Sequence, residues 1–334
     1  FLACDTGVGS DYAFNINGSS FVVEDCEFNG CWAAAYFTAP AATTGVFVNT
    51  AFKNCAKDAW GTAALKADSM AVIAATNCWF YRGWVSQEHQ QAASAFTTAA
   101  SGGLHQFYKC TFEENYSTGH ARGTVVIQGS SGICFDKCRF LRNRNENTNS
   151  YADLHSACIA YGQSKSPDSF CRDCFFEGNY ASSTANGTAN YVSSILSARG
   201  AVTFSNCTIL NSTNDISGAD CPAGTFALRG ASIGLVNCVV KDTANLTANS
   251  AEITVTGTPS VGIINSVLTS KEPSYRALRP LDSTLPPTMA IRSLRSADAS
   301  STASRSAVWT AAAALSHTTM PMSSSSPSSA NALS

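Results

Sequence analysis

The chain has 334 residues, of which 45% are hydrophobic and only 13% charged, and its formal net charge is −2. That length and apolar content are enough for one large domain or two ordinary ones. The near-neutral charge and the lack of a Lys/Arg run predict no nucleic-acid partner. No window approaches the ~18–20 apolar residues of a membrane-spanning helix, so we expect no transmembrane segment. The chain begins with Phe1 and shows no leader, which indicates a mature or truncated chain.

A repeat with a period of about 30 residues runs through the first 270 residues. An apolar residue stands two positions after each of nine anchor residues, and in six copies it is Phe. Positions three and five before the anchor are also mainly apolar. The anchors are Cys26, Thr50, Cys78, Cys110, Cys138, Cys174, Cys207, Cys238 and Ser266. Each apolar pair has the two-residue period of a strand, but the step between the pairs is odd, so the chain must turn a corner there.

The residue just before each anchor is polar in all nine copies, and in five it is Asn. Asn tolerates the left-handed backbone conformation that a tight corner needs. A further short apolar run, such as 35–37 or 125–127, precedes each pair of strands. The sequence therefore predicts an all-β, single-stranded, right-handed parallel β-helix over 1–270, with about nine coils of three short strands. Stacked columns of Cys and Phe would fill it, and Asn115, Asn143 and Asn179 would hydrogen-bond along it near the next bend.

Composition changes abruptly near residue 270. All 14 Cys and all 23 Gly precede this point, and the tail that follows is rich in Ser, Ala and Pro. Its apolar pattern is too weak to offset the entropy of ordering, so we expect 271–334 to be a disordered stalk, linker or terminal extension. An out-of-frame translation would produce the same break.

Seven of the cysteines occupy anchor positions and should point inward. Parallel side chains on neighbouring coils keep their Cβ atoms about 4.8 Å apart, which is wider than the usual 3.5–4.5 Å of a disulfide. We therefore interpret them as small buried residues. Cys134, Cys138, Cys171 and Cys174 have a zinc-like spacing, but Cys138 and Cys174 are themselves anchors of the repeat, so we expect no zinc site there.

Three copies carry the motif F-x-x-N, as FEEN at 112–115, FLRN at 140–143 and FEGN at 176–179. The motif resembles the repeats of polymorphic outer-membrane proteins, a β-helical family of surface proteins and adhesins. More distantly, the coils resemble the pectate-lyase-like superfamily of β-helices that act on polysaccharides. The first resemblance implies a binding role at the cell surface, and the second implies an enzyme.

Outward positions on three consecutive coils offer catalytic candidates, namely Tyr108, Lys109, Asp136, Lys137, Arg172 and Asp173. Asp136 and Asp173 could hold a calcium ion that bridges a uronate. Arg172 or Lys137 would then remove the adjacent proton in a β-elimination. The alternative is a solvated face on which opposite charges alternate. We expect no other metal or cofactor.

Exposed aromatic residues offer a second kind of site. Trp79, Tyr81, Arg82 and Trp84 lie close together in the sequence and could stack on sugars or anchor a protein partner. They could equally cover that end of the rod.

Three functions remain open. The first is a secreted or cell-surface, adhesin-like protein that binds an extracellular glycan or surface protein without catalysis. The long loops at 143–156 and 179–194 add contact surface to it. The second is a polysaccharide lyase or another carbohydrate-active β-helix enzyme that uses calcium. The third is a structural spacer module.

Overall fold

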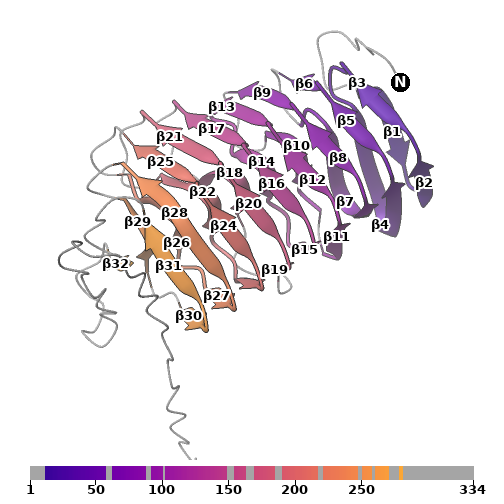
Figure 1. Cartoon of the computed structure of the whole chain (residues 1–334). Coiled ribbons are helices and arrows are strands. Elements are labelled where there is room, and N and C mark those ends of the chain that lie inside the picture. Colours follow the sequence, from indigo (N-terminus) through magenta and orange to yellow (C-terminus); the bar gives the residue numbers. More distant parts are fainter. Residues whose placement is uncertain are drawn as a thin grey trace, which may run out of the picture.

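The computed structural model describes residues 12–57, 62–87, 92–100, 102–148, 154–162, 169–184, 190–216, 221–246, 250–257, 260–270 and 278–280. All pairings between the described strands are parallel, and the strands stack into a β-solenoid with the form of a rod (Figure 1). No described residue is helical. The all-β, parallel β-helical fold predicted from the repeat is therefore confirmed.

Each turn of the solenoid passes through four strand positions. The first two belong to one large sheet, in which β4 (Ala35–Val48) and β7 (Leu65–Thr76) run through both positions. The other strands at the first position are β1 (Phe14–Asn17), β10 (Ala93–Thr98), β14 (Gly123–Ile127), β18 (Leu154–Tyr161), β22 (Tyr191–Ala198), β26 (Ala223–Arg229), β29 (Ser250–Thr256) and β32 (Leu278–Pro280). Those at the second are β2 (Phe21–Glu24), β11 (Leu104–Tyr108), β15 (Gly132–Asp136), β19 (Ser169–Arg172), β23 (Val202–Ser205), β27 (Ile233–Val236) and β30 (Val261–Ile264).

The last two strand positions form the other sheet. The third position follows the anchor and carries the Phe column; its strands are β3 (Glu27–Asn29), β5 (Ala51–Lys53), β8 (Trp79–Tyr81), β12 (Thr111–Glu113), β16 (Arg139–Leu141), β20 (Phe175–Glu177), β24 (Thr208–Leu210), β28 (Val239–Asn245) and β31 (Val267–Ser270). The fourth contains β6 (Ala56–Lys57), β9 (Trp84–Gln87), β13 (Tyr116–Gly119), β17 (Arg144–Asn147), β21 (Tyr180–Ser183), β25 (Thr213–Ile216) and the end of β28.

The strand at the fourth position is an addition to the predicted pattern. Residues that the sequence indicated as the starts of long loops form β17 and β21. These strands escaped the sequence analysis because their inward residues are largely polar, as with Asn145 and Asn147, so apolar alternation is missing. The fourth position is occupied in about seven turns of the described chain, slightly fewer than the nine coils expected.

The corner before the anchor has the predicted left-handed backbone in every copy. The residue there has a φ between 48° and 56° in Asp25, Asn49, Asn77, Lys109, Lys137, Asp173, Asn206, Asn237 and Asn265. The next bend, near which the Asn column was predicted, also has left-handed backbone, at the position four residues after the anchor, for example at Arg82 and Glu114. Two such bends per turn fold the chain around the core.

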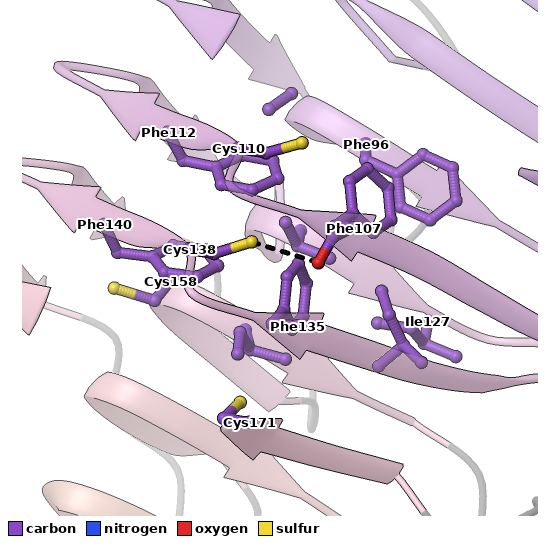
Figure 2. Packing of buried hydrophobic residues seen from close by; sticks show 14 of the residues in the cluster. Phe96, Phe107, Cys110, Phe112, Ile127, Phe135, Cys138, Phe140, Cys158 and Cys171 are labelled. Atoms are coloured by element: carbon purple, nitrogen blue, oxygen red, sulfur yellow. Dashed lines mark hydrogen bonds between the residues drawn. The ribbon is translucent and has the colours of Figure 1, made fainter. Parts of the chain in front are cut away.

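Stacked phenylalanine rings fill the interior. Phe28, Phe52, Phe80, Phe112, Phe140 and Phe176 are fully buried, and each ring lies 4.6–5.0 Å from the next with nearly parallel planes. Phe107 and Phe135, three residues before their anchors, pack edge-on or at a tilt against this column (Figure 2). The predicted inward columns are thus the hydrophobic core.

The anchor residues contribute hydrogen bonds as well as volume. The Sγ–H group of Cys138 donates to the backbone carbonyl of Phe107 on the preceding coil, at 3.2 Å (Figure 2). Thr50 and Ser266, where the column lacks Cys, use their hydroxyls in the same way toward Val23 and Leu235. Small residues with a donor group therefore suit this corner, which explains why Cys, Thr and Ser interchange there. The thirteen described cysteines all have free thiols.

A buried ladder of asparagines stabilises the second corner, as predicted. Asn115 Nδ2 donates to Asn143 Oδ1 at 2.9 Å, and Asn143 Nδ2 donates to Asn179 Oδ1 at 3.1 Å. The same amide groups donate to the carbonyls of Phe80 and Phe112. Each Asn therefore satisfies backbone groups at the bend that no strand ladder reaches.

Most of the predicted disordered tail lies outside the described residues. The exception is β32, whose backbone pairs with β29 of the solenoid. The middles of the two long loops, 149–153 and 185–189, also lie outside the described residues.

Candidate functional surfaces

The catalytic candidates meet on the outer face of the large sheet. The strand register places Tyr108, Asp136 and Arg172 side by side on β11, β15 and β19. The Arg172 guanidinium forms an ion pair with Asp136 Oδ2. Asp136 Oδ1 is buried and has no hydrogen-bond partner among the described residues. The expected juxtaposition on consecutive coils is therefore present.

The chemistry of this cluster fits a structural ion pair better than a proton-transfer site. The hydrogen bond that Arg172 donates to Asp136 raises the pKa of Arg172 above its usual value, which keeps the guanidinium protonated and unsuited to accept a proton. The two lysines flank an aromatic ring instead of a carboxylate: the Nζ atoms of Lys109 and Lys137 lie 5.1 and 5.7 Å from the Tyr108 ring centroid.

The two carboxylates that we considered for calcium have other partners. Asp136 pairs with the guanidinium, and Asp173 Oδ1 accepts a hydrogen bond from Asn206 Nδ2 at 3.0 Å. Calcium takes six to eight oxygen ligands. Within the described ranges, no cluster of three or more His, Cys, Asp or Glu side chains is placed to hold a metal ion. Asp136 Oδ2 and Asp173 Oδ1 therefore each already bond to a neighbouring side chain of the solenoid.

Three of the four aromatic-site candidates form one cluster on the outer face of β8 and the turn after it. The Trp79 and Tyr81 rings stack with centroids 4.7 Å apart. Arg82 lies over the Tyr81 ring at 4.8 Å, and Lys53 lies over Trp79 at 5.2 Å. Two hydrogen bonds to the next coil hold the cluster: Trp79 Nε1 donates to Glu113, and Arg82 Nε donates to Glu114. The rings are therefore held rigidly on a surface that faces solvent.

Trp84 lies beyond the second corner, at the start of β9, and 37% of its surface is exposed. It heads a row of large side chains on the outer face of the fourth strand position. Tyr116, Arg144 and Tyr180 follow it on β13, β17 and β21, each paired in register with its neighbour. The sequence analysis missed this row, although all four residues stand six positions after their anchors. That constant offset was the signal available in the sequence.

His105, five residues before its anchor, is buried in the core. His105 Nδ1 accepts a hydrogen bond from the Ile73 backbone N–H at 3.0 Å. Burial lowers the pKa of His105 to about 3, so its ring is neutral. This agrees with its inward position in the repeat.

Comparison with known proteins adds no relative. No protein-family model matches the chain. No curated protein and no solved structure matches it either. None of the described residues belongs to a helix with the length and apolar character needed to span a membrane.

Proposed function

We propose that the chain is a non-catalytic binding rod, adhesin-like in its role, that is secreted or displayed at the cell surface and holds an extracellular glycan or surface protein. The observation that carries the proposal is the stacked pair of Trp79 and Tyr81, which lies on an outer face between Lys53 and Arg82. Rigid aromatic rings beside cationic groups are typical of contact surfaces, because they bury area at little entropic cost.

Two further considerations support a binding role. The F-x-x-N motifs resemble those of polymorphic outer-membrane proteins, whose surface display and adhesion we extend to this chain as part of the proposal. In addition, Asp136 and Arg172 neutralise each other, which suits a stable outer face better than an acid–base pair.

The labelled full chain should be applied to an array of glycans and to immobilised extracellular proteins. We expect binding, and we expect the double variant Trp79→Ala, Tyr81→Ala to reduce it strongly. Phe175→Ala, an outward aromatic on β20 three coils away, is the matched control and should bind like the parent.

Two outcomes would overturn the proposal. Absence of binding to both classes of probe would favour a spacer module. Release of unsaturated product from polygalacturonate, lost in Arg172→Ala, would identify a lyase. Surface display is tested separately by protease treatment of intact producing cells, which should cleave the protein without lysis.

A further inference from the structure

The row on the outer face of the fourth strand position is a second surface, distinct from the Trp79 and Tyr81 pair. Trp84, Tyr116, Arg144 and Tyr180 follow one another on successive coils, along a long edge of the rod marked by β9, β13, β17 and β21 (Figure 1). Neighbouring coils are about 4.8 Å apart, so Tyr116 and Tyr180 are separated by ~9.6 Å along the axis. We call these four residues the aromatic row.

Hydrogen bonds to the following coil hold the tyrosines in place. Tyr116 Oη donates to Glu146 Oε2 at 2.6 Å, and Tyr180 Oη donates to Asp215 Oδ2 at 3.1 Å. Each hydroxyl therefore reaches one coil forward, which lays its ring along the rod axis. The Arg144 guanidinium lies 4.9 Å from the Tyr180 centroid and 5.9 Å from that of Tyr116, so it fills the space between the rings. Tyr116, Arg144 and Tyr180 therefore form one continuous platform over three coils.

A polar column runs beside this platform. Two residues after each member of the row, the next outward positions carry Ser86, Thr118, Glu146 and Ser182, and Asp215 continues the column on the following coil. All five side chains bear hydroxyl or carboxylate oxygens. The face thus offers a stripe of aromatic surface with a parallel stripe of hydrogen-bonding groups.

Charge decides which polymer this face suits. The aromatic row and the polar column together carry one cation, Arg144, and two carboxylates, Glu146 and Asp215. Arg144 is already paired with Glu146. The remaining carboxylate repels polyanions such as uronates and nucleic acids, and no unpaired cation on these two columns attracts them.

From this geometry we propose that the aromatic row binds a linear, uncharged polysaccharide that lies along the rod axis. The apolar faces of successive sugars stack on Trp84, Tyr116 and Tyr180, while their hydroxyls bond to the polar column. The periodic spacing of the coils places these rings at intervals comparable with the length of one or two sugar units. This proposal deepens the proposed binding function and depends on it.

Affinity electrophoresis of the full chain in gels containing hydroxyethylcellulose, xyloglucan or galactomannan tests the proposal, with polygalacturonate as the anionic comparison. We expect retardation by at least one neutral polymer and none by polygalacturonate. Tyr116→Ala and Tyr180→Ala should each weaken binding by roughly tenfold, which corresponds to about 1.4 kcal/mol, since each removes a ring on which a sugar stacks. Tyr116→Phe, which keeps the ring but loses its anchor to Glu146, should lose less.

Controls separate this surface from the other. Phe175→Ala and the Trp79→Ala, Tyr81→Ala pair should retain neutral-polymer binding, and thermal unfolding must show that every variant folds. Binding unchanged in the two Tyr→Ala variants would overturn the inference, as would lack of binding to all three neutral polymers. If the parent nevertheless binds a protein or an anionic glycan through Trp79 and Tyr81, the proposed function stands and only the aromatic row is refuted.

Discussion

Replacing Asn143 by Ala should reveal how much stability the buried ladder contributes. The side chain of Asn143 takes part in four hydrogen bonds: Nδ2 donates to the Phe112 carbonyl and to Asn179 Oδ1, while Oδ1 accepts from the backbone N–H and the Nδ2 of Asn115. Its removal leaves two buried backbone groups, the Phe112 carbonyl and the Asn115 N–H, without these partners. The side chains of Asn115 and Asn179 each keep another bond.

Each buried polar group left unsatisfied costs about 1–3 kcal/mol, so Asn143→Ala should lower the free energy of unfolding by about 2–6 kcal/mol. Urea unfolding of the full chain, followed by circular dichroism, measures this loss. Thr203→Ala, at an exposed outward position of β23, is the control and should change stability by less than about 0.5 kcal/mol. A loss below about 1 kcal/mol in Asn143→Ala would refute the ladder as a source of stability.

Three further results are expected. Phe112→Ala, in the middle of the ring stack, should cost about 3–5 kcal/mol in urea unfolding, and a loss near that of an exposed site would contradict close stacking. Burial raises the pKa of Glu252 although three side chains donate hydrogen bonds to its carboxylate, so the folded protein should lose stability as pH rises from the ordinary carboxyl range through the raised pKa. Thermal melts of Glu252→Gln at several pH values should lose this pH dependence. A pH profile unchanged from that of the parent would disprove the prediction. Finally, the double variant Lys109→Asn, Lys137→Asn should have a higher midpoint of thermal unfolding than the parent. Asn tolerates the left-handed backbone at these two positions and would extend the exposed amide ladder that includes Asn77. A lower midpoint would contradict this prediction.

The inward half of the fold was predictable because packing and backbone geometry restrict it. Every coil must place an apolar residue where Phe112 and Phe140 stack, and a residue tolerant of left-handed backbone where Asn77 and Asn237 stand. These restraints repeat at each turn, so they appear in the sequence as columns. The strand carrying Asn145 was not predictable in this way, because its inward side is polar and hydrogen-bonds to backbone such as the Ala121 carbonyl. Polar interiors have no two-residue apolar period.

The candidate sites were only partly predictable, since outward positions are not restricted by the core. The repeat correctly placed Asp136 beside Arg172, because register follows from the columns. The sequence did not predict that Asp136 and Arg172 form an ion pair, because the partner of a side chain on an open face depends on the residues of three or more coils. Asp173, for instance, accepts a hydrogen bond from Asn206 on the next coil and is not paired with Arg172 or Lys137.

The same freedom makes the aromatic row informative. Phe112 is explained by the core that it fills, and Asn115 by the corner that it satisfies, so neither demands a function. Nothing in the solenoid requires a large ring at an outward position six residues after the anchor, where Thr213 stands in another coil. Large side chains on four consecutive coils at that offset therefore call for a cause outside the fold. A ligand that extends across several coils is such a cause, because it contacts the same kind of side chain on each coil along the rod.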